Sequence, residues 1–292
     1  MMPSGTEIGQ AIVSGLLVGG TYAALAAGFS LTWGVTKVIN LSHTIFALAA
    51  SYVAYWLLRF LSIEPLLSLL IVIPVLFASG LAIHGTVIRQ TEKRTKEITP
   101  ASMVLTFGLT IVIENILLIT CKADPRLITT SYSGKSLFLG RLCFPISSLI
   151  AFALAAAAIA ALYFFLHRTY MGKAVRAVWQ SNAGAMLCGI NINRVTAITY
   201  GMSLASAGIG GICMGLIYSI DPAVHFSWLI FVFLVVVLGG VGSILGAGMS
   251  GLLIGLIIGL AGTFLPYAWL NLVLFTSLII VLLIKPEGLF RQ

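Results

Sequence analysis

The chain has 292 residues, of which 60% are hydrophobic and 8% are charged, and its mean hydropathy is +1.10. Soluble domains carry about 25% charged residues, so this composition excludes a water-soluble globular protein and indicates a membrane protein. The formal net charge is +8. The Lys and Arg residues lie between apolar stretches, where they orient a membrane protein, and this placement argues against a nucleic-acid partner.

Apolar stretches of about 20 residues, the length of a membrane-spanning helix, recur along the chain. They lie at 8–31, 41–61, 66–88, 101–120, 145–166, 195–219, 227–241, 248–264 and 267–284. The glycine-rich run from Gly239 to Ser243 interrupts two short stretches, which indicates that one of them is broken or re-entrant. The sequence therefore predicts an all-α integral membrane protein with about eight to nine transmembrane helices, in a single domain covering residues 1–292.

Lys and Arg gather in three segments, at 89–97, at 168–194 and in the carboxyl-terminal tail. Alternating crossings place all three on one side of the membrane, and the positive-inside rule makes that side cytoplasmic. The 122–144 segment then lies on the outer side, and the carboxyl terminus lies in the cytoplasm.

The central cationic segment, from Arg168 to Asn191, consists of good helix formers punctuated by glycine. We expect it to form a helix at the membrane surface, where another protein can press on it. A cationic helix lying on anionic membrane lipid is the alternative interpretation.

Sequence patterns of catalysis are absent, so we predict that the chain is not an enzyme. No HExxH or GxSxG motif occurs. The run Ser133-Gly134-Lys135-Ser136 resembles the end of a nucleotide-binding loop, but Thr129 occupies the place of its leading glycine. The four cysteines fit no metal or redox spacing, and no metal site is predicted. Cys121 and Cys143 bracket one polar loop, and both a disulfide and two free thiols remain open.

Two polar features interrupt the apolar stretches. Glu114 lies well inside one of them, and we favour a packing role beside Asn115 because no second intramembrane acid or base is evident. Asn40, Ser42 and His43 follow a glycine, and irregular backbone there is tolerated in lipid only against protein or a water-filled cavity. An ordinary turn at the membrane surface is the equal alternative.

Four segments in order carry a resemblance to a known family. They are Gly28–Val35 continuing into Val38–His43; Gly172–Ala177 with Asn182 and Ala185–Asn191; Val237–Ala247; and Lys285–Phe290. Over nearly its whole length the chain resembles the permease subunit of branched-chain amino-acid ABC importers, the LivH type, in a group that includes LivM-type and ribose-type permeases. Thr44 stands where the family pattern has glycine and Trp33 where it has tyrosine, so the transported solute stays open.

The resemblance implies a role for the central segment, because importer permeases carry a cytoplasmic coupling helix with an EAA-xxx-G signature, similar to Ala183-Gly184-Ala185-x-x-x-Gly189. It implies ATPase coupling, within about 168–194, by Gly172, Lys173, Arg176, Ala185 and Gly189. With the helix breaks, it points to a substrate pathway at Asn40, Ser42, His43, Gly239, Gly240 and Gly242.

The same resemblance implies partners and a location. These are two ATP-binding cassette subunits, a paralogous permease and a solute-binding protein in a bacterial-type inner membrane, with ATP bound by partner subunits and no cofactor in this chain. The expected cargo is a branched-chain or related amino acid. A stand-alone secondary transporter or channel for a small polar solute is the alternative, and it would show paired intramembrane ionisable groups or an inverted repeat.

Overall fold

The computed structural model describes residues 4–95 and 97–290. Within these ranges seven helices are long and apolar enough to cross a membrane: α1 (Gly5–Thr36), α2 (His43–Leu61), α3 (Pro65–Ile83) continued through η1 (His84–Ile88) and α4 (Arg89–Arg94), α5 (Ile98–Cys121), α6 (Ile146–Arg168), α9 (Ile192–Ile217) and α11 (Ile244–Phe264). Two shorter apolar helices are α10 (Val224–Gly239) and, after the 3-10 turn η2 (Tyr267–Trp269), α12 (Leu270–Ile284). The all-α integral membrane fold is confirmed.

The glycine-rich break is present between α10 and α11. Gly240 and Gly242 adopt φ angles of 90° and 89°, which residues other than glycine rarely adopt. The helix before the break starts at Val224, three residues earlier than the expected stretch at 227–241. That shift brings His225 into the helix.

A two-stranded antiparallel hairpin, β1 (Ser136–Leu139) and β2 (Leu142–Pro145), lies in the segment that we expected to be loop. Gln10 of α1 fastens it, because its side-chain amide exchanges two hydrogen bonds of 2.8 Å with the backbone of Cys143. The hairpin is therefore tied to the amino-terminal end of α1.

Helix α1 is the centre of the fold. Its 32 residues make a helix about 48 Å long, longer than the hydrocarbon core of about 30 Å. Residues 19–32 are buried without interruption, and α1 packs against α6, α9, α10 and α11.

Glycines allow α1 and α11 to approach backbone to backbone. A Cβ atom placed on Gly19 would lie 2.6 Å from the Gly251 carbonyl oxygen, and one on Gly15 would lie 2.5 Å from the Gly255 carbonyl oxygen. At these spacings only glycine fits, so the glycines of α1 and α11 serve helix packing, as small residues do in membrane proteins.

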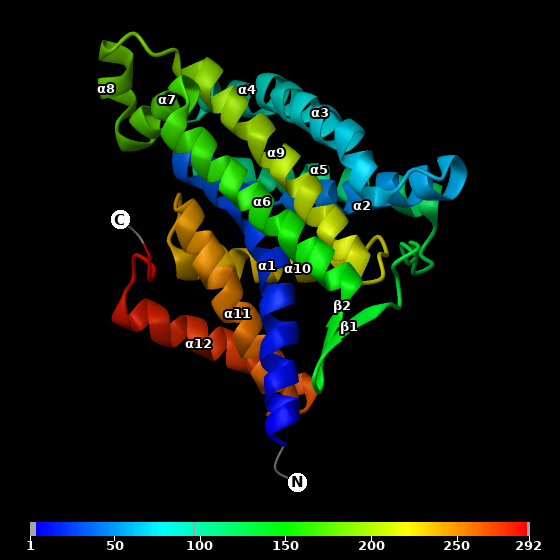
Figure 1. Cartoon of the computed structure of the whole chain (residues 1–292). Helices are drawn as coiled ribbons and strands as arrows, with labels where there is room; N and C mark the ends of the chain where they lie inside the picture. Colours follow the sequence, from blue (N-terminus) through cyan, green and yellow to red (C-terminus); the bar gives the residue numbers. More distant parts are fainter. Residues whose placement is uncertain (1–3, 96, 291–292) are drawn as a thin grey trace.

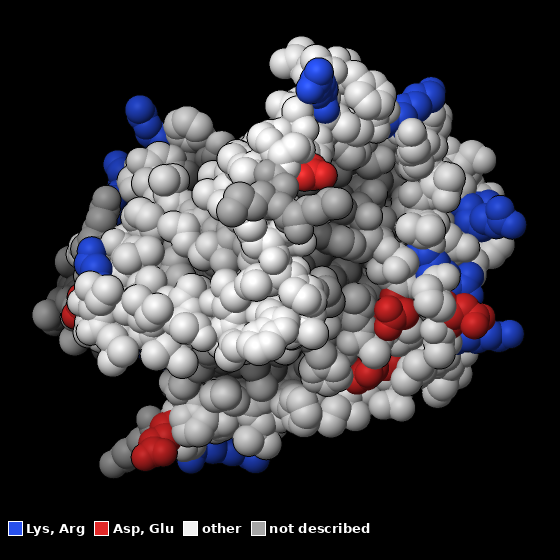
Figure 2. Space-filling model, turned by 90° about the horizontal axis from the view of Figure 1, so that it is seen from below, with Lys and Arg blue, Asp and Glu red and all other residues white. Residues whose placement is uncertain are grey.

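The cationic helices and the hairpin lie at opposite ends of the molecule. Helices α4, α7 (Tyr170–Gln180) and α8 (Asn182–Leu187) lie together at one end, and the hairpin lies toward the other (Figure 1). We refer to these as the coupling end and the hairpin end. Viewed from below the orientation of Figure 1, the Lys and Arg residues lie mainly toward the edge of a largely uncharged surface (Figure 2).

Replacing Gly19 by alanine should separate α1 from α11. The added methyl group has no free space, so we expect the free energy of unfolding to fall by about 1–3 kcal/mol, measured as a lower melting temperature of the detergent-solubilised protein. Gly248→Ala on α11 is the control, because the nearest atom to its Cβ would lie 3.8 Å away. Equal melting temperatures for the two variants would contradict this packing.

Candidate functional site

Helix α7 folds back against the end of α6, and Gly172 makes this possible. Gly172 is buried, and a Cβ atom there would collide with the backbone of Phe165 and Leu166. The Thr169 side chain starts the helix by accepting a hydrogen bond from the Gly172 N–H at 2.9 Å. On the other face of α7 the Lys173 side chain is exposed.

Gly189 ends α8 in left-handed geometry, with φ at 75°. Its N–H donates to the Met186 carbonyl and the Ile190 N–H donates to the Ala185 carbonyl, both at 3.0 Å. This pair of bonds is the Schellman arrangement that closes a helix. The expected helical character of 168–194 is confirmed, although as two helices separated at Ser181 rather than one. Ala185 is buried under the turn.

Large apolar side chains are exposed at this end. Leu187 is 90% exposed, Tyr170 is 83% exposed and Met186 is 59% exposed. We call the two neighbouring residues Met186 and Leu187 of α8 the α8 patch. Exposed apolar groups next to cationic ones mark sites that another protein or a membrane covers.

Trp179 of α7 reaches into the break between α10 and α11. A Cβ atom on Gly242 would lie 2.9 Å from the indole ring of Trp179, and one on Gly34 of α1 would lie 2.5 Å from Gly242 itself. The Gly242 N–H donates to the Ser30 hydroxyl of α1 at 2.9 Å. The indole, the break and the end of α1 therefore form one contact, which we call the Trp179 joint.

The tail closes the same break from a further side. The Leu289 N–H donates to the Leu238 carbonyl at 2.8 Å, and Gly288 packs against Gly240. The tail therefore lies with the break at the coupling end. Residues from three of the four segments that carry the family resemblance meet here, together with Trp179.

The segment between α1 and α2 turns back into the interior. His43 Nε2 lies 3.0 Å from the Leu25 carbonyl, although Leu25 is eleven residues before Thr36, which ends α1. That separation corresponds to about 16 Å along the helix. Residues 37–42 therefore run inward as irregular backbone. An ordinary surface turn is excluded, and protein rather than lipid surrounds the segment.

Side chains of α5 and of the segment itself satisfy this backbone. The Leu41 N–H donates to the Thr106 hydroxyl at 3.0 Å, and the backbone N–H and hydroxyl of Ser42 both donate to Asn40 Oδ1, at 3.1 and 2.6 Å. Because the Leu25 carbonyl only accepts, His43 carries its proton on Nε2 and its Nδ1 faces the Ser203 hydroxyl at 3.4 Å.

Several buried polar atoms around this segment have no hydrogen-bond partner: Asn40 Nδ2, Thr44 Oγ1, Tyr200 OH and His84 Nε2. The Tyr200 hydroxyl lies beside Ser42, and the Tyr200 and His84 rings are 6.2 Å apart between centroids. Buried polar groups normally have partners, so this region is suited to hold water or a polar solute. Sequence reasoning missed Tyr200 and His84, which lie on apolar helices far from Asn40 in the chain.

The two groups of expected pathway residues contact different elements. The Phe29 ring of α1 is 5.6 Å from the His43 ring of the first group and 6.0 Å from the Phe233 ring of α10, the helix that ends at the second group, measured between centroids. The first group adjoins α5 and α9, and the second adjoins α7 and the tail.

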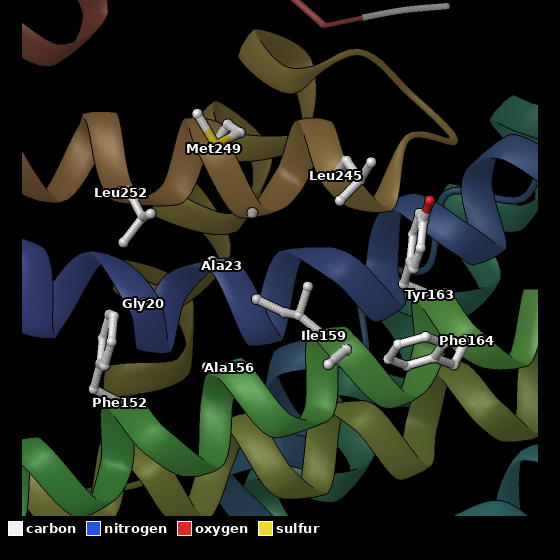
Figure 3. Close-up of a pocket in the computed structure, with 12 residues that line it drawn as sticks. Gly20, Ala23, Phe152, Ala156, Ile159, Tyr163, Phe164, Leu245, Met249 and Leu252 are labelled. Atoms are coloured by element: carbon white, nitrogen blue, oxygen red, sulfur yellow. The ribbon is translucent and has the colours of Figure 1, made fainter.

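An apolar cavity of about 360 Å³ lies elsewhere, between α1, α6 and α11. Phe152 and Ile159 of α6 face Leu252 and Met249 of α11 across it, and Gly20 of α1 lies between them (Figure 3). None of the expected pathway residues lines this cavity.

The expectation that Glu114 has no intramembrane partner is wrong. His225 Nε2 lies 3.6 Å from Glu114 Oε2. The pair is not evident from the sequence because the predicted apolar stretch starts at residue 227, after His225. Within the described residues all four cysteines are free, so Cys121 and Cys143 are not paired.

These features define a multi-pass membrane protein with broken helices. Residues 11–283 match the family model described as the branched-chain amino acid transport system / permease component. The chain belongs to this family, which is a transport family rather than a catalytic one.

Relatives support the same assignment. The high-affinity branched-chain amino acid transport system permease protein BraD of Pseudomonas aeruginosa is 27% identical, with 97% of this chain and 95% of the relative covered. LivH of Salmonella typhimurium, of the same description, is 28% identical over the same shares. A probable branched-chain amino acid transport permease protein LivH of Methanocaldococcus jannaschii is 30% identical, with 85% and 78% covered. No solved structure matches the chain.

Substitution of Gly189 should loosen the end of α8. Alanine at a φ of 75° is strained, and we expect a local cost of about 1 kcal/mol. Amide hydrogen exchange at residues 189 and 190 should become faster. Gly184→Ala is the control, because Gly184 lies inside α8 and its nearest neighbour, Ser181, would be at 3.5 Å. Unchanged exchange in the Gly189→Ala protein would contradict the cap.

Proposed function

We propose that this chain is the permease subunit of an ABC importer that moves a branched-chain or related amino acid across the inner (cytoplasmic) membrane. The observation that carries the proposal is the closed, exposed α7–α8 unit on a chain of the permease family. The relatives are described as permease proteins of high-affinity transport systems, and such a permease works with other subunits.

The proposed partners are two ATP-binding cassette subunits, a paralogous permease and a solute-binding protein. The α8 patch and the exposed Lys173 supply apolar and cationic side chains, which suit the docking of an ATPase. ATP is bound by those partner subunits. Membrane lipid covers apolar side chains that project from α3, α5 and α12, such as Leu70, Val104 and Leu283.

The Trp179 joint supplies the mechanical link in this proposal. A rigid-body movement of α7 and α8, driven by the ATPases, displaces the indole ring that packs on Gly242 and adjoins Gly34. Since Gly172 fixes α7 to α6, the same movement bears on that helix. Gly172, Lys173, Arg176, Ala185 and Gly189 are therefore the coupling residues.

The inward-turning segment is the proposed core of the solute pathway. Asn40, Ser42 and His43 stand in irregular backbone, and Asn40 Nδ2 is a buried donor without a partner. Broken helices line cavities in transporters because their free polar groups can contact the solute. The glycines at 239, 240 and 242 form the second, movable wall, behind Phe29.

The Glu114–His225 pair is the one observation that favours the alternative, a stand-alone secondary transporter. The two functions differ in their need for ATP. A carrier works alone, whereas the importer needs the ATPase subunits.

Uptake of radiolabelled L-leucine by proteoliposomes that hold this chain with its partner subunits and binding protein tests the function. We expect uptake only with ATP inside and binding protein outside. Uptake without the ATPase subunits would support the carrier instead. Asn40→Asp, which keeps the oxygen that Ser42 needs but loses the free amide, should lower uptake about tenfold, the value of one hydrogen bond.

Asn40→Leu is the matched variant for this experiment. It loses the accepting oxygen as well, so it should also weaken co-purification of the partner subunits, which Asn40→Asp should leave intact. Normal uptake by the Asn40→Asp complex would remove Asn40 from the pathway.

The proposed orientation places the coupling end, and with it the carboxyl-terminal tail, in the cytoplasm. Cys188 is exposed next to α8 and reports on this directly. A membrane-impermeant maleimide should label it in inside-out vesicles and not in intact cells, with Cys188→Ser as the control for the other cysteines. Labelling of Cys188 from outside intact cells would show that the orientation is the opposite of the one proposed.

A further inference from the structure

Glu114 of α5 and His225 of α10 form an intramembrane pair that sequence reasoning did not find. The His225 side chain is fully buried and that of Glu114 is 18% exposed. The 3.6 Å between Nε2 and Oε2 is too long for a hydrogen bond, and neither ring nitrogen of His225 has another partner. The pair is therefore close but incompletely satisfied.

A purely structural role explains this arrangement poorly. Removing a carboxylate and an imidazole from water is costly unless good hydrogen bonds replace those to water. Here two buried nitrogens of His225 lack such bonds, while part of Glu114 stays accessible. A polar group that fits between these side chains and bonds to both would remove the deficit.

The neighbouring side chains determine whether that polar group is a cation or an anion. Asp221, four residues before His225 in the loop that precedes α10, places a second carboxylate near the imidazole. The Tyr52 hydroxyl of α2, buried and without a hydrogen-bond partner, is also near Asp221. Two carboxylates, an imidazole and a hydroxyl are acceptors that together suit a cation.

Arg126, the protein's own cationic side chain in this region, already has other partners. Arg126 donates to the Cys121 carbonyl at 2.8 Å, and its guanidinium stacks over Trp56 at 4.9 Å and Tyr55 at 5.4 Å from the ring centroids. Glu114 lies seven residues, or about 10 Å, farther along α5 than Cys121 toward the coupling end. Arg126 therefore stands nearer the hairpin end and does not neutralise Glu114 by direct contact.

The position on α5 connects the pair to the proposed pathway. Thr106, which holds the inward-turning segment, and Thr110 are both buried, and Glu114 follows at the same four-residue spacing. Residues at that spacing lie on one face of a helix. The pair therefore lies on the face of α5 that leads from the hairpin end to Asn40.

We propose that Glu114 and His225 form the subsite that binds the ammonium group of the amino-acid solute in the half of the membrane nearer the hairpin end. This inference rests on the proposed function for its ligand. Glu114 accepts from the ammonium group with a charge-assisted bond, and the unprotonated nitrogen of His225 accepts a second hydrogen bond. At 3.6 Å the two side chains are close enough for one ammonium group to bond to both.

The test measures binding of radiolabelled isopentylamine, the analogue of leucine that lacks the carboxyl group, to the purified membrane complex without binding protein. The wild-type complex should bind it saturably. Glu114→Gln should weaken binding at least about tenfold, since it replaces a charged acceptor by a neutral one. Glu114→Asp, which keeps the charge, should retain more of the binding. Glu97→Gln is the control, because Glu97 is an exposed carboxylate at the other end of α5.

Equal amine binding by wild type and Glu114→Gln, or no saturable binding by wild type, would overturn the subsite and leave the pair holding only a proton. Co-purification of the partner subunits with Glu114→Gln shows that the complex has assembled; if it fails, Glu114→Asp decides by the same binding measurement. L-leucine uptake by the wild-type complex is measured in parallel. If the wild-type complex takes up leucine but Glu114→Gln leaves amine binding unaltered, the subsite alone is refuted. If Glu114→Gln loses amine binding but the wild-type complex takes up no leucine, the proposed cargo alone is refuted.

Discussion

A hydrocarbon layer offers no hydrogen-bond partner, so each interruption of a helix must be satisfied by the protein itself. The structure meets this constraint at two places. Thr106 supplies the polar groups that the backbone between α1 and α2 needs. Ser30 and the tail residue Leu289 bond to the break between α10 and α11. Both places adjoin α1, which explains why this one helix is buried over so much of its length.

The closeness of these contacts gives the coupling end its mechanical character. Glycine at 34 and 242 brings two backbones so near that a methyl group would not fit, and the Trp179 ring closes the third side. Such a packed joint cannot deform gradually and instead moves as a unit. Three of the four segments that resemble the permease family contribute residues to this joint or to the break beside it, which gives a physical reason for those three occurring together.

Composition and apolar length were enough to predict the all-α membrane fold, and the glycine run at 239–243 correctly indicated a helix break. The last glycine of the coupling signature, Gly189, ends a helix with left-handed geometry, which is consistent with the helix expected there. Hydropathy could not show that residues 37–42 turn inward, because a surface turn has the same composition. It also could not show which helices are neighbours. The contacts of Trp179 and Tyr200 therefore could not be predicted. His225 was left outside the predicted apolar stretch because polar residues at the start of a helix lower the hydropathy that defines its boundary. The pathway and coupling roles of the residues that were named stay predictions.

The polar face of α5 also bears on the source of energy. Between Glu114 and the coupling end this face carries the hydroxyls of Thr110, Thr106 and Ser102, each of which bonds to a carbonyl of its own helix. Such hydroxyls stabilise a polar face but do not titrate, so along α5 a proton held by Glu114 has no ionisable group to pass to. Proton-coupled carriers depend on chains of acidic groups and histidines for that transfer. The pair is therefore better suited to the proposed solute contact than to a proton relay. In that proposal the movement that releases the solute reaches the pathway through the Trp179 joint.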